Sequence, residues 1–293
     1  MRHLTILTLL VTLCACQPPL AGALAPRLIC HNSNCVEPPV PEEDDTLESL
    51  EASLALVDDG DRPYIDGVEI DTFWHGEEGR CLFAHDLTQD DAIDAAEAAR
   101  FLLDHIRARR RAGEPLTRRP GPFAVFVELK GHVSESKADK HTEEQRAQHL
   151  ACVLDVLTIL STPAEAEGFD LLVGFTSFDP LLLQELAEAL DREGHVSTAR
   201  VELVLGALRG PPPPLAGDTV PIEEFTANDA ISLADVHPHW VRESDYQAYD
   251  SLGWDLGFWM FSVVPETFAM IDLRRPRWVT TSEAQTLVRW LER

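Results

Sequence analysis

Residues 66–86 read DGVEIDTFWHGEEGRCLFAHD, and this stretch combines a strand typical of a protein core with charges that such strands seldom carry. Glu69 and Asp71 are two positions apart, so in an extended strand both side chains point to one face, whereas Val68 and Ile70 point to the other. Two carboxylates on one face of a core strand are costly unless a cation or strong donors satisfy them. The next apolar run ends on His85. We therefore expect a polar site between the two acids and His85.

Eight short apolar runs are typical of strands, because several are rich in β-branched or aromatic residues and are bounded by turn-forming residues. They cover residues 26–31, 68–73, 124–130, 171–177, 201–208, 231–237, 256–263 and 277–281. The stretches between them show helical spacing or N-terminal caps and cover residues 45–57, 90–110, 142–159, 179–190, 244–252, 265–271 and 282–291. Strands that alternate with helices predict a parallel sheet covered by helices.

The number of these units favours a closed α/β barrel. Eight strand–helix units in about 265 residues match the size of a (β/α)8 TIM barrel. The alternative is an open doubly wound sheet, but no glycine-rich phosphate loop follows the first strand. Residues 210–217, GPPPPLAG, leave little room for a helix and predict a stiff loop at the rim. Residues 37–45 predict a solvated loop.

The composition limits the partners of this protein. Its formal net charge is −26, and 45% of its 293 residues are hydrophobic, which is enough for a substantial core. Such a charge excludes nucleic acid as a partner, since phosphate binding needs a basic surface. It also excludes binding to an anionic membrane by charge alone. An acidic protein does concentrate divalent cations near its surface.

The N-terminus predicts export. Residues 1–15 have a basic start, an apolar stretch and a small-residue end, which is typical of a signal peptide. Residues 13–16, LCAC, resemble the bacterial lipobox, which implies cleavage before Cys16 and lipid modification of that cysteine. Residues 16–26 would then be a tether and residues 27–293 the barrel of an exported lipoprotein, anchored in the membrane and periplasm-facing or on the surface of the outer membrane. The alternative is a plain signal peptide cut near residues 23–25.

Four further cysteines remain after the signal, namely Cys30, Cys35, Cys81 and Cys152. An exported protein tolerates disulfides, and four cysteines allow three pairings between which the sequence does not choose. A local bridge between Cys30 and Cys35 is one prediction, and four small buried thiols are the alternative. A zinc site is disfavoured, because no pair of cysteines has the two-residue spacing of zinc ligands.

Polar residues gather where the predicted strands end, which is where barrel enzymes build their active sites. The first half of the barrel supplies three acids, two histidines and a lysine: His31, Glu69, Asp71, His85, Glu128 and Lys130. Later strands end near Ser177, His237, Trp259, Ser262 and Thr280. Scattered surface polarity would not cluster in this way, so we predict a site on the first half of one rim.

The order of these residues resembles the glycerophosphodiester phosphodiesterase superfamily, whose motifs run H-R-G, E-N-T, E-x-D, H-D and E-x-K. Here they correspond to His31, the segment at Asp44-Asp45-Thr46, VEID, AHD and ELK. Ser177-Phe178, Phe258-Trp259 and WVTTSEA at 278–284 resemble the later motifs. The resemblance covers nearly the whole chain after the signal.

For this sequence the resemblance implies one divalent cation bound by Glu69, Asp71 and Glu128. Oxygen ligands suit a hard cation, so Mg²⁺ or Ca²⁺ is expected. His31 and His85 would be the acid and base, one taking a proton from the attacking hydroxyl and the other giving one to the leaving oxygen. Lys130 would neutralise phosphate charge together with the cation. The implied activity is that of a phosphoric diester hydrolase acting on glycerophosphodiesters or phospholipid headgroups.

The chain departs from the family pattern at four positions. Asn32 and Ser33 stand where the family has arginine and glycine, and Asp44 and Asp45 replace glutamate and asparagine. An amide does not supply the charge of a guanidinium that clamps phosphate. Two alternatives therefore stay open. One is a sphingomyelinase D or phospholipase D-like activity, although that branch has a cysteine-tied catalytic loop after its second histidine that is not found here. The other is a non-catalytic barrel lipoprotein that binds headgroups or partners.

Overall fold

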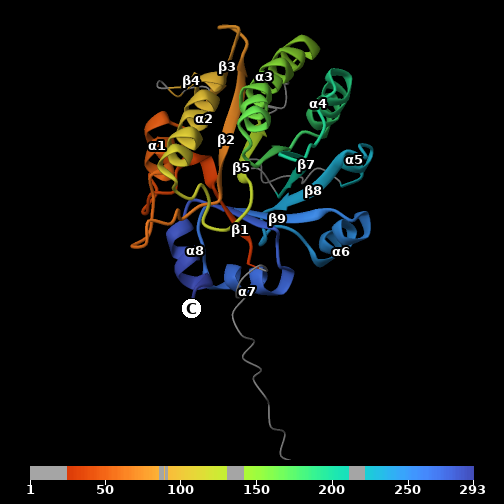
Figure 1. Cartoon of the computed structure of the whole chain (residues 1–293). Coiled ribbons are helices and arrows are strands. Elements are labelled where there is room, and N and C mark those ends of the chain that lie inside the picture. The colour runs from red at the N-terminus through yellow and green to blue at the C-terminus, as the bar shows by residue number, and fades with distance from the viewer. Residues whose placement is uncertain (1–24, 86–88, 90–91, 131–141, 211–221) are drawn as a thin grey trace, which may run out of the picture.

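The computed structural model describes residues 25–85, 89, 92–130, 142–210 and 222–293 (Figure 1). The predicted signal peptide, the predicted lipidation site Cys16 and nearly all of the proline-rich loop at 210–217 lie outside the described residues. The described chain begins just before the first strand.

Eight parallel strands close into a barrel, which confirms the predicted TIM-barrel class. β1 pairs with both β2 and β10, so the sheet has no free edge around the barrel. The barrel strands are β1 (Arg27–Cys30), β2 (Gly67–His75), β5 (Phe123–Leu129), β6 (Leu171–Ser177), β7 (Val201–Arg209), β8 (Ile231–Val236), β9 (Asp255–Met260) and β10 (Trp278–Thr281). Residues 25 and 26 precede β1, so the chain enters the barrel at the end opposite the one where the strands finish.

Helices follow the strands, as the alternating pattern predicts. They are α1 (Leu47–Leu54), α2 (Ala95–Ala112), α3 (Glu143–Glu167), α4 (Pro180–Glu193), α5 (Ile222–Thr226), α6 (Glu243–Leu252), α7 (Pro265–Arg274) and α8 (Ala284–Leu291). Two short 3-10 turns, η1 (His31–Ser33) and η2 (Pro41–Glu43), lie between β1 and α1. The capping predictions are confirmed, because Thr46 accepts from the Ser49 amide and Asp179 accepts from the Leu181 and Leu182 amides.

α3 extends furthest beyond the end that the sequence pattern predicts. α3 continues to Glu167 although Pro163 lies inside it. Among the described helices, only α3 has the length and apolarity of a membrane span. It contacts α2, α4 and β2 and buries side chains such as Val153 and Leu157, which is how a covering helix of a barrel behaves.

Two short strands extend the sheet beyond the barrel and were not among the predicted ones. β3 (Arg80–Phe83) pairs antiparallel with β2, and β4 (Ile93–Asp94) pairs antiparallel with β3. Figure 1 shows β2 and β3 standing as a ribbon beyond the barrel. Because β3 runs back toward the barrel, the Ala84 amide donates to the backbone oxygen of Asp71 at 3.3 Å. The ribbon thus returns the chain to the end of the barrel where the parallel strands finish.

Alternation along the strands divides the core into two regions. Val68, Ile70 and Val127 belong to the large apolar cluster between the strands and the helices. Ile29, Phe126, Leu233 and Trp278 belong to a smaller cluster that side chains of alternate strand positions form inside the barrel. Polar side chains follow this inner cluster toward the ends of the strands.

Two disulfides are present. Cys30 pairs with Cys35, which confirms the predicted local bridge, and Cys81 pairs with Cys152, which joins β3 to α3. The structure therefore selects one of the three pairings, and the reading as four free thiols is wrong.

The start of β2 leaves no room for a side chain. A Cβ on Gly67 would lie 2.2 Å from the backbone oxygen of Ala124, whereas a Cβ on Gly76 would meet only the end of the Gln145 side chain. Backbone cannot move aside as a flexible side chain does.

We expect Gly67→Ala to lower the free energy of unfolding by about 3 kcal/mol, and Gly76→Ala by far less. Denaturant unfolding of both variants checks this, and equal effects would contradict the close approach of β2 and β5.

Candidate functional site

The predicted site residues meet at one end of the barrel. Glu69 and Asp71 lie on β2, and Glu128 lies on β5, where it pairs in register with Asp71. All three carboxylates are buried. Lys130 directly follows β5, His31 directly follows β1, and His85 follows β3. The structure thus brings together all six side chains that the sequence singled out, and their individual roles stay predictions.

Lys130 forms the strongest charge contact of the site. Its Nζ lies 2.7 Å from Asp71 Oδ2 and 2.7 Å from Glu128 Oε1. Although burial acts against the charge, the two carboxylates raise the pKa of Lys130 above its ordinary value. Burial and Asp71 raise the pKa of Glu128 to about 7, and Lys130 limits that rise. The ammonium group therefore joins two of the three predicted cation ligands.

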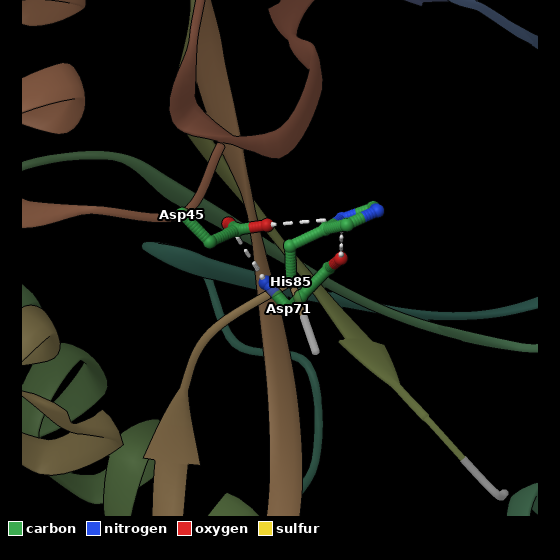
Figure 2. Close-up of side chains that lie close together, drawn as sticks. All are labelled: Asp45, Asp71 and His85. Atoms are coloured by element: carbon green, nitrogen blue, oxygen red, sulfur yellow. Dashed lines mark hydrogen bonds and ion pairs between the residues drawn. The ribbon is translucent and has the colours of Figure 1, made fainter. Parts of the chain in front are cut away.

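His85 is held between two aspartates (Figure 2). Its Nδ1 lies 3.3 Å from Asp71 Oδ2 and 3.8 Å from Asp45 Oδ2. Burial opposes the charged ring, but the neighbouring Asp45 and Asp71 carboxylates raise the pKa of His85 to about 10. Burial likewise opposes the Asp71 carboxylate, but Lys130 and His85 lower its pKa to about 2. In this charge state His85 is a proton donor.

His31 has the opposite environment. Its side chain is buried, its Nε2 lies 3.8 Å from Glu69 Oε2, and its ring packs edge-on against Phe261 at 5.0 Å. Burial lowers the pKa of His31 to about 3, which makes the ring neutral. The pKa of Glu69 is raised by burial and by the charges of Glu128 and Asp71. The two histidines therefore differ in charge, as an acid and a base must.

Asn32 links the two histidines. It follows His31 in η1, and its Nδ2 lies 3.1 Å from His85 Nδ1 and 3.0 Å from Asp44 Oδ2. Its backbone amide donates to Glu69 Oε2 at 3.4 Å. An amide in the position of the family's arginine thus connects the loop after β1 with both β2 and the β3 end.

Asp45 was missed as a member of the site, because residues 37–45 were predicted as a solvated loop. That prediction is wrong for Asp45, which is fully buried. Its Oδ1 accepts from the Asp71 amide at 3.3 Å, and its own amide donates to the Asn32 oxygen at 2.9 Å. Its place directly before the Thr46 cap was the available signal, since a residue before a helix in a barrel lies at the rim.

The donor atoms at this end fit a divalent cation. Among the described residues, Asp45, Asp71 and His85 form a group whose ligand atoms lie within 4.8 Å of one another. Asp45 Oδ2 and Asp71 Oδ1 are buried and have no hydrogen-bond partner in the described chain. Buried carboxylate oxygens need a donor or a cation, so these atoms are suited to a metal. The group shares Asp71 with the predicted set of Glu69, Asp71 and Glu128, and its imidazole nitrogen widens the choice of metals.

Asp235 lies on β8 and adds a further acid inside the barrel. It is fully buried, and neither carboxylate oxygen has a hydrogen-bond partner among the described residues. Burial and the charge of Glu128 raise the pKa of Asp235 to about 8. A Cβ on Gly257 would lie 2.7 Å from Asp235 Oδ1, so this glycine leaves space for the carboxyl group. Asp235 was not among the predicted site residues, although its position near the end of a predicted strand was an available signal.

The other predicted rim residues lie around the site without joining the charged group. Ser177 Oγ donates to the Leu129 oxygen at 2.8 Å, and Trp259 Nε1 donates to the Arg209 oxygen. The His237 ring stacks on Trp240 at 3.7 Å. These contacts are consistent with the predicted packing or rim role.

Comparison with solved structures identifies this type of barrel. A glycerophosphodiester phosphodiesterase from Parabacteroides distasonis superimposes with a TM-score of 0.56 at 12% identity, covering 91% of this chain and 96% of that one. A phosphodiesterase from Oleispira antarctica, in complex with the product sn-glycerol-3-phosphate, superimposes with a TM-score of 0.52 at 17% identity, covering 92% and 98%. The fold is that of the glycerophosphodiester phosphodiesterases. No protein-family model matches the sequence, and no curated protein matches it.

This likeness confirms the family resemblance at the level of the fold. The glycerophosphodiester phosphodiesterase barrel extends over about nine-tenths of the chain in both comparisons. At such low identity the likeness does not transfer an activity, which has to be argued from the site.

The raised pKa of Asp235 gives a stability prediction. The folded protein binds this proton up to about pH 8, whereas the ordinary aspartate value is 3.8. The stabilising contribution of the proton is therefore complete below about pH 4 and is lost as the pH rises to 8. We expect Asp235→Asn to raise the Tm at pH 8 by about 2 °C or more, and to change it little at pH 4.

Thermal unfolding of the variant and of the unsubstituted protein checks this prediction. A chelator is present, because a bound cation would favour the ionised carboxylate of Asp235 over its protonated form. Asp229→Asn, an exposed change in the turn before β8, is the matched control. A Tm of Asp235→Asn that falls at pH 8 would show that the carboxylate has an ionic partner in the folded protein.

Proposed function

We propose that this chain is a metal-dependent phosphoric diester hydrolase that acts on glycerophosphodiesters or phospholipid headgroups. The observation that carries the proposal is the charged group at the end of this barrel, where Asp45, Asp71 and Glu128 surround Lys130 and His85. The bound product named for the Oleispira antarctica phosphodiesterase supports the choice of phosphodiester as substrate class.

We assign each residue a proposed role from its position in the site. A cation such as Mg²⁺ or Ca²⁺ would be held by Asp71 and Asp45, together either with His85 or with Glu69 and Glu128. The cation would neutralise charge on the phosphate. Lys130 lies at the same carboxylates and would bind a non-bridging phosphate oxygen. His31 and His85 approach these acids from β1 and from the β3 end. One would accept the proton of the attacking hydroxyl, and the other would protonate the leaving oxygen.

We also propose that the protein is exported and attached to a membrane through Cys16. The signal-like residues 1–15 and the lipobox resemblance support this, together with two disulfides in the described chain. Disulfides persist in oxidising compartments. Mass spectrometry of the N-terminal peptide is the test, with a diacylglycerol-modified Cys16 as the expected result and an unmodified cysteine as the contrary one.

Turnover with a panel of substrates tests the activity. The full chain is assayed with glycerophosphocholine, glycerophosphoethanolamine, lysophosphatidylcholine and sphingomyelin, in Mg²⁺, Ca²⁺ or Mn²⁺. We expect release of the headgroup or of a phosphate product from at least one of them, and loss of that release in excess EDTA. No turnover of any member would favour the non-catalytic barrel, and turnover confined to sphingomyelin would favour the sphingomyelinase D-like alternative.

Substitution of His85 tests its role in the chemistry. His85→Gln removes the group that transfers a proton, and we expect kcat to fall by about 10²–10⁴-fold. The matched control is His75→Gln at the far end of the same β2–β3 ribbon, where His75 Nδ1 only accepts from the Glu78 amide. Steady-state kinetics and Tm are measured for both variants. Equal kcat values for the two variants would remove His85 from the mechanism.

A further inference from the structure

A small covalent ring carries the first histidine of the site. The Cys30–Cys35 disulfide joins the last residue of β1 to a residue five positions later. The ring holds His31, Asn32, Ser33 and Asn34, all of them buried, as are both cysteines. This bridge is the local one that the sequence predicted, and it has no role in the function proposed above.

The backbone inside the ring is unusual. Asn32 and Ser33 have φ values of 48° and 56°, so two consecutive non-glycine residues adopt the left-handed conformation. L-residues with a side chain rarely adopt it, and they persist there only when their surroundings hold them. The disulfide limits the conformations open to these residues, because it fixes the distance between the two ends of the ring.

The ring contacts three residues of the site, Glu69, Asp45 and His85. The backbone amide of Asn32 donates to Glu69 Oε2, and the side-chain Nδ2 of Asn32 lies close to His85 Nδ1 and Asp44 Oδ2. The backbone oxygen of Asn32 accepts from the Asp45 amide at 2.9 Å, and Ser33 Oγ donates to the backbone oxygen of Glu69 at 2.8 Å. A change in the backbone of the ring would therefore displace His31 and release the contacts of Asp45 and His85.

The two disulfides close loops of very different length, so they differ in how much they restrict the unfolded chain. A disulfide restricts the unfolded chain more when it closes a longer loop. Cys81–Cys152 spans 71 residues and links β3 to α3, so it acts mainly on global stability. Cys30–Cys35 spans only five and restricts the unfolded chain less than the other bridge does. It also fixes the local geometry of the folded protein around His31 and Asn32.

We propose that the Cys30–Cys35 disulfide is a positioning element of the site, which holds His31 and Asn32 against Glu69, His85 and Asp45. The part that concerns turnover rests on the proposed hydrolase function. The bridge does not touch the substrate and acts through the residues that it encloses. The chain would then have its full activity only in the oxidised form, while the barrel folds without this bridge.

Two double variants of the full chain test the proposal. We expect Cys30→Ala/Cys35→Ala to lower kcat at least about tenfold with KM within about twofold, and to lower the Tm less than the control does. The matched control, Cys81→Ala/Cys152→Ala, should lower the Tm clearly and leave kcat at 25 °C close to that of the unsubstituted protein. A Cys30→Ala/Cys35→Ala protein with unchanged kcat, or with a kcat loss that simply follows its Tm, would overturn the proposal.

Hydrogen exchange supplies a readout that does not depend on turnover. The Asn32 and Asp45 amides donate within the group described above, so both should exchange faster in Cys30→Ala/Cys35→Ala and stay protected in the control. Unchanged exchange of both amides would overturn the positioning role. If the unsubstituted protein turns over no phosphodiester, the proposed function fails, and the exchange data still decide whether the disulfide holds the ring.

Discussion

The contact on which the site depends is the pair of ion pairs from Lys130 to Asp71 and Glu128. Five carboxylates are buried at this end of the barrel or just inside it: Asp45, Glu69, Asp71, Glu128 and Asp235. Like charges removed from water repel strongly, and the group is tolerated only with cations or protons among them. Lys130 and protonated His85 supply two positive charges, and a proton on Asp235 removes one negative charge. Burial also raises the pKa of Glu69 and of Asp45, so further protons or a divalent cation would neutralise the remaining charge.

The fold brings these groups together through strand alternation and the closure of the barrel. Glu69 and Glu128 lie on the face of their strands that also carries Phe126, so the inner apolar cluster gives way to carboxylates toward the strand ends. The same alternation directs Val68 and Val127 to the helices. Acids that lie 57 positions apart in the chain thus become neighbours, because Asp71 and Glu128 are paired residues of adjacent parallel strands.

Much of this was accessible from the sequence, because the period of two and the order of the motifs are local signals. The eight barrel strands, the Thr46 and Asp179 caps and the Cys30–Cys35 bridge follow from residues close together in the chain. Other features depend on contacts between distant residues. Asp45 is buried because Asp71 and Asn32 cover it, although its neighbours in the chain are prolines and acids. β3 forms because β2 continues past the barrel, and α3 continues through Pro163 because its apolar face is packed.

The direction in which the chain enters the barrel decides how an anchored protein would face its surroundings. Residues 25 and 26 lead into β1 at the end opposite the charged group. A molecule held at a bilayer by its first residues would therefore carry the charged group at the end of the barrel away from its point of attachment. A soluble phosphodiester would reach that end from the aqueous compartment, whereas a phospholipid of the same bilayer would reach it only if the barrel turned on its attachment.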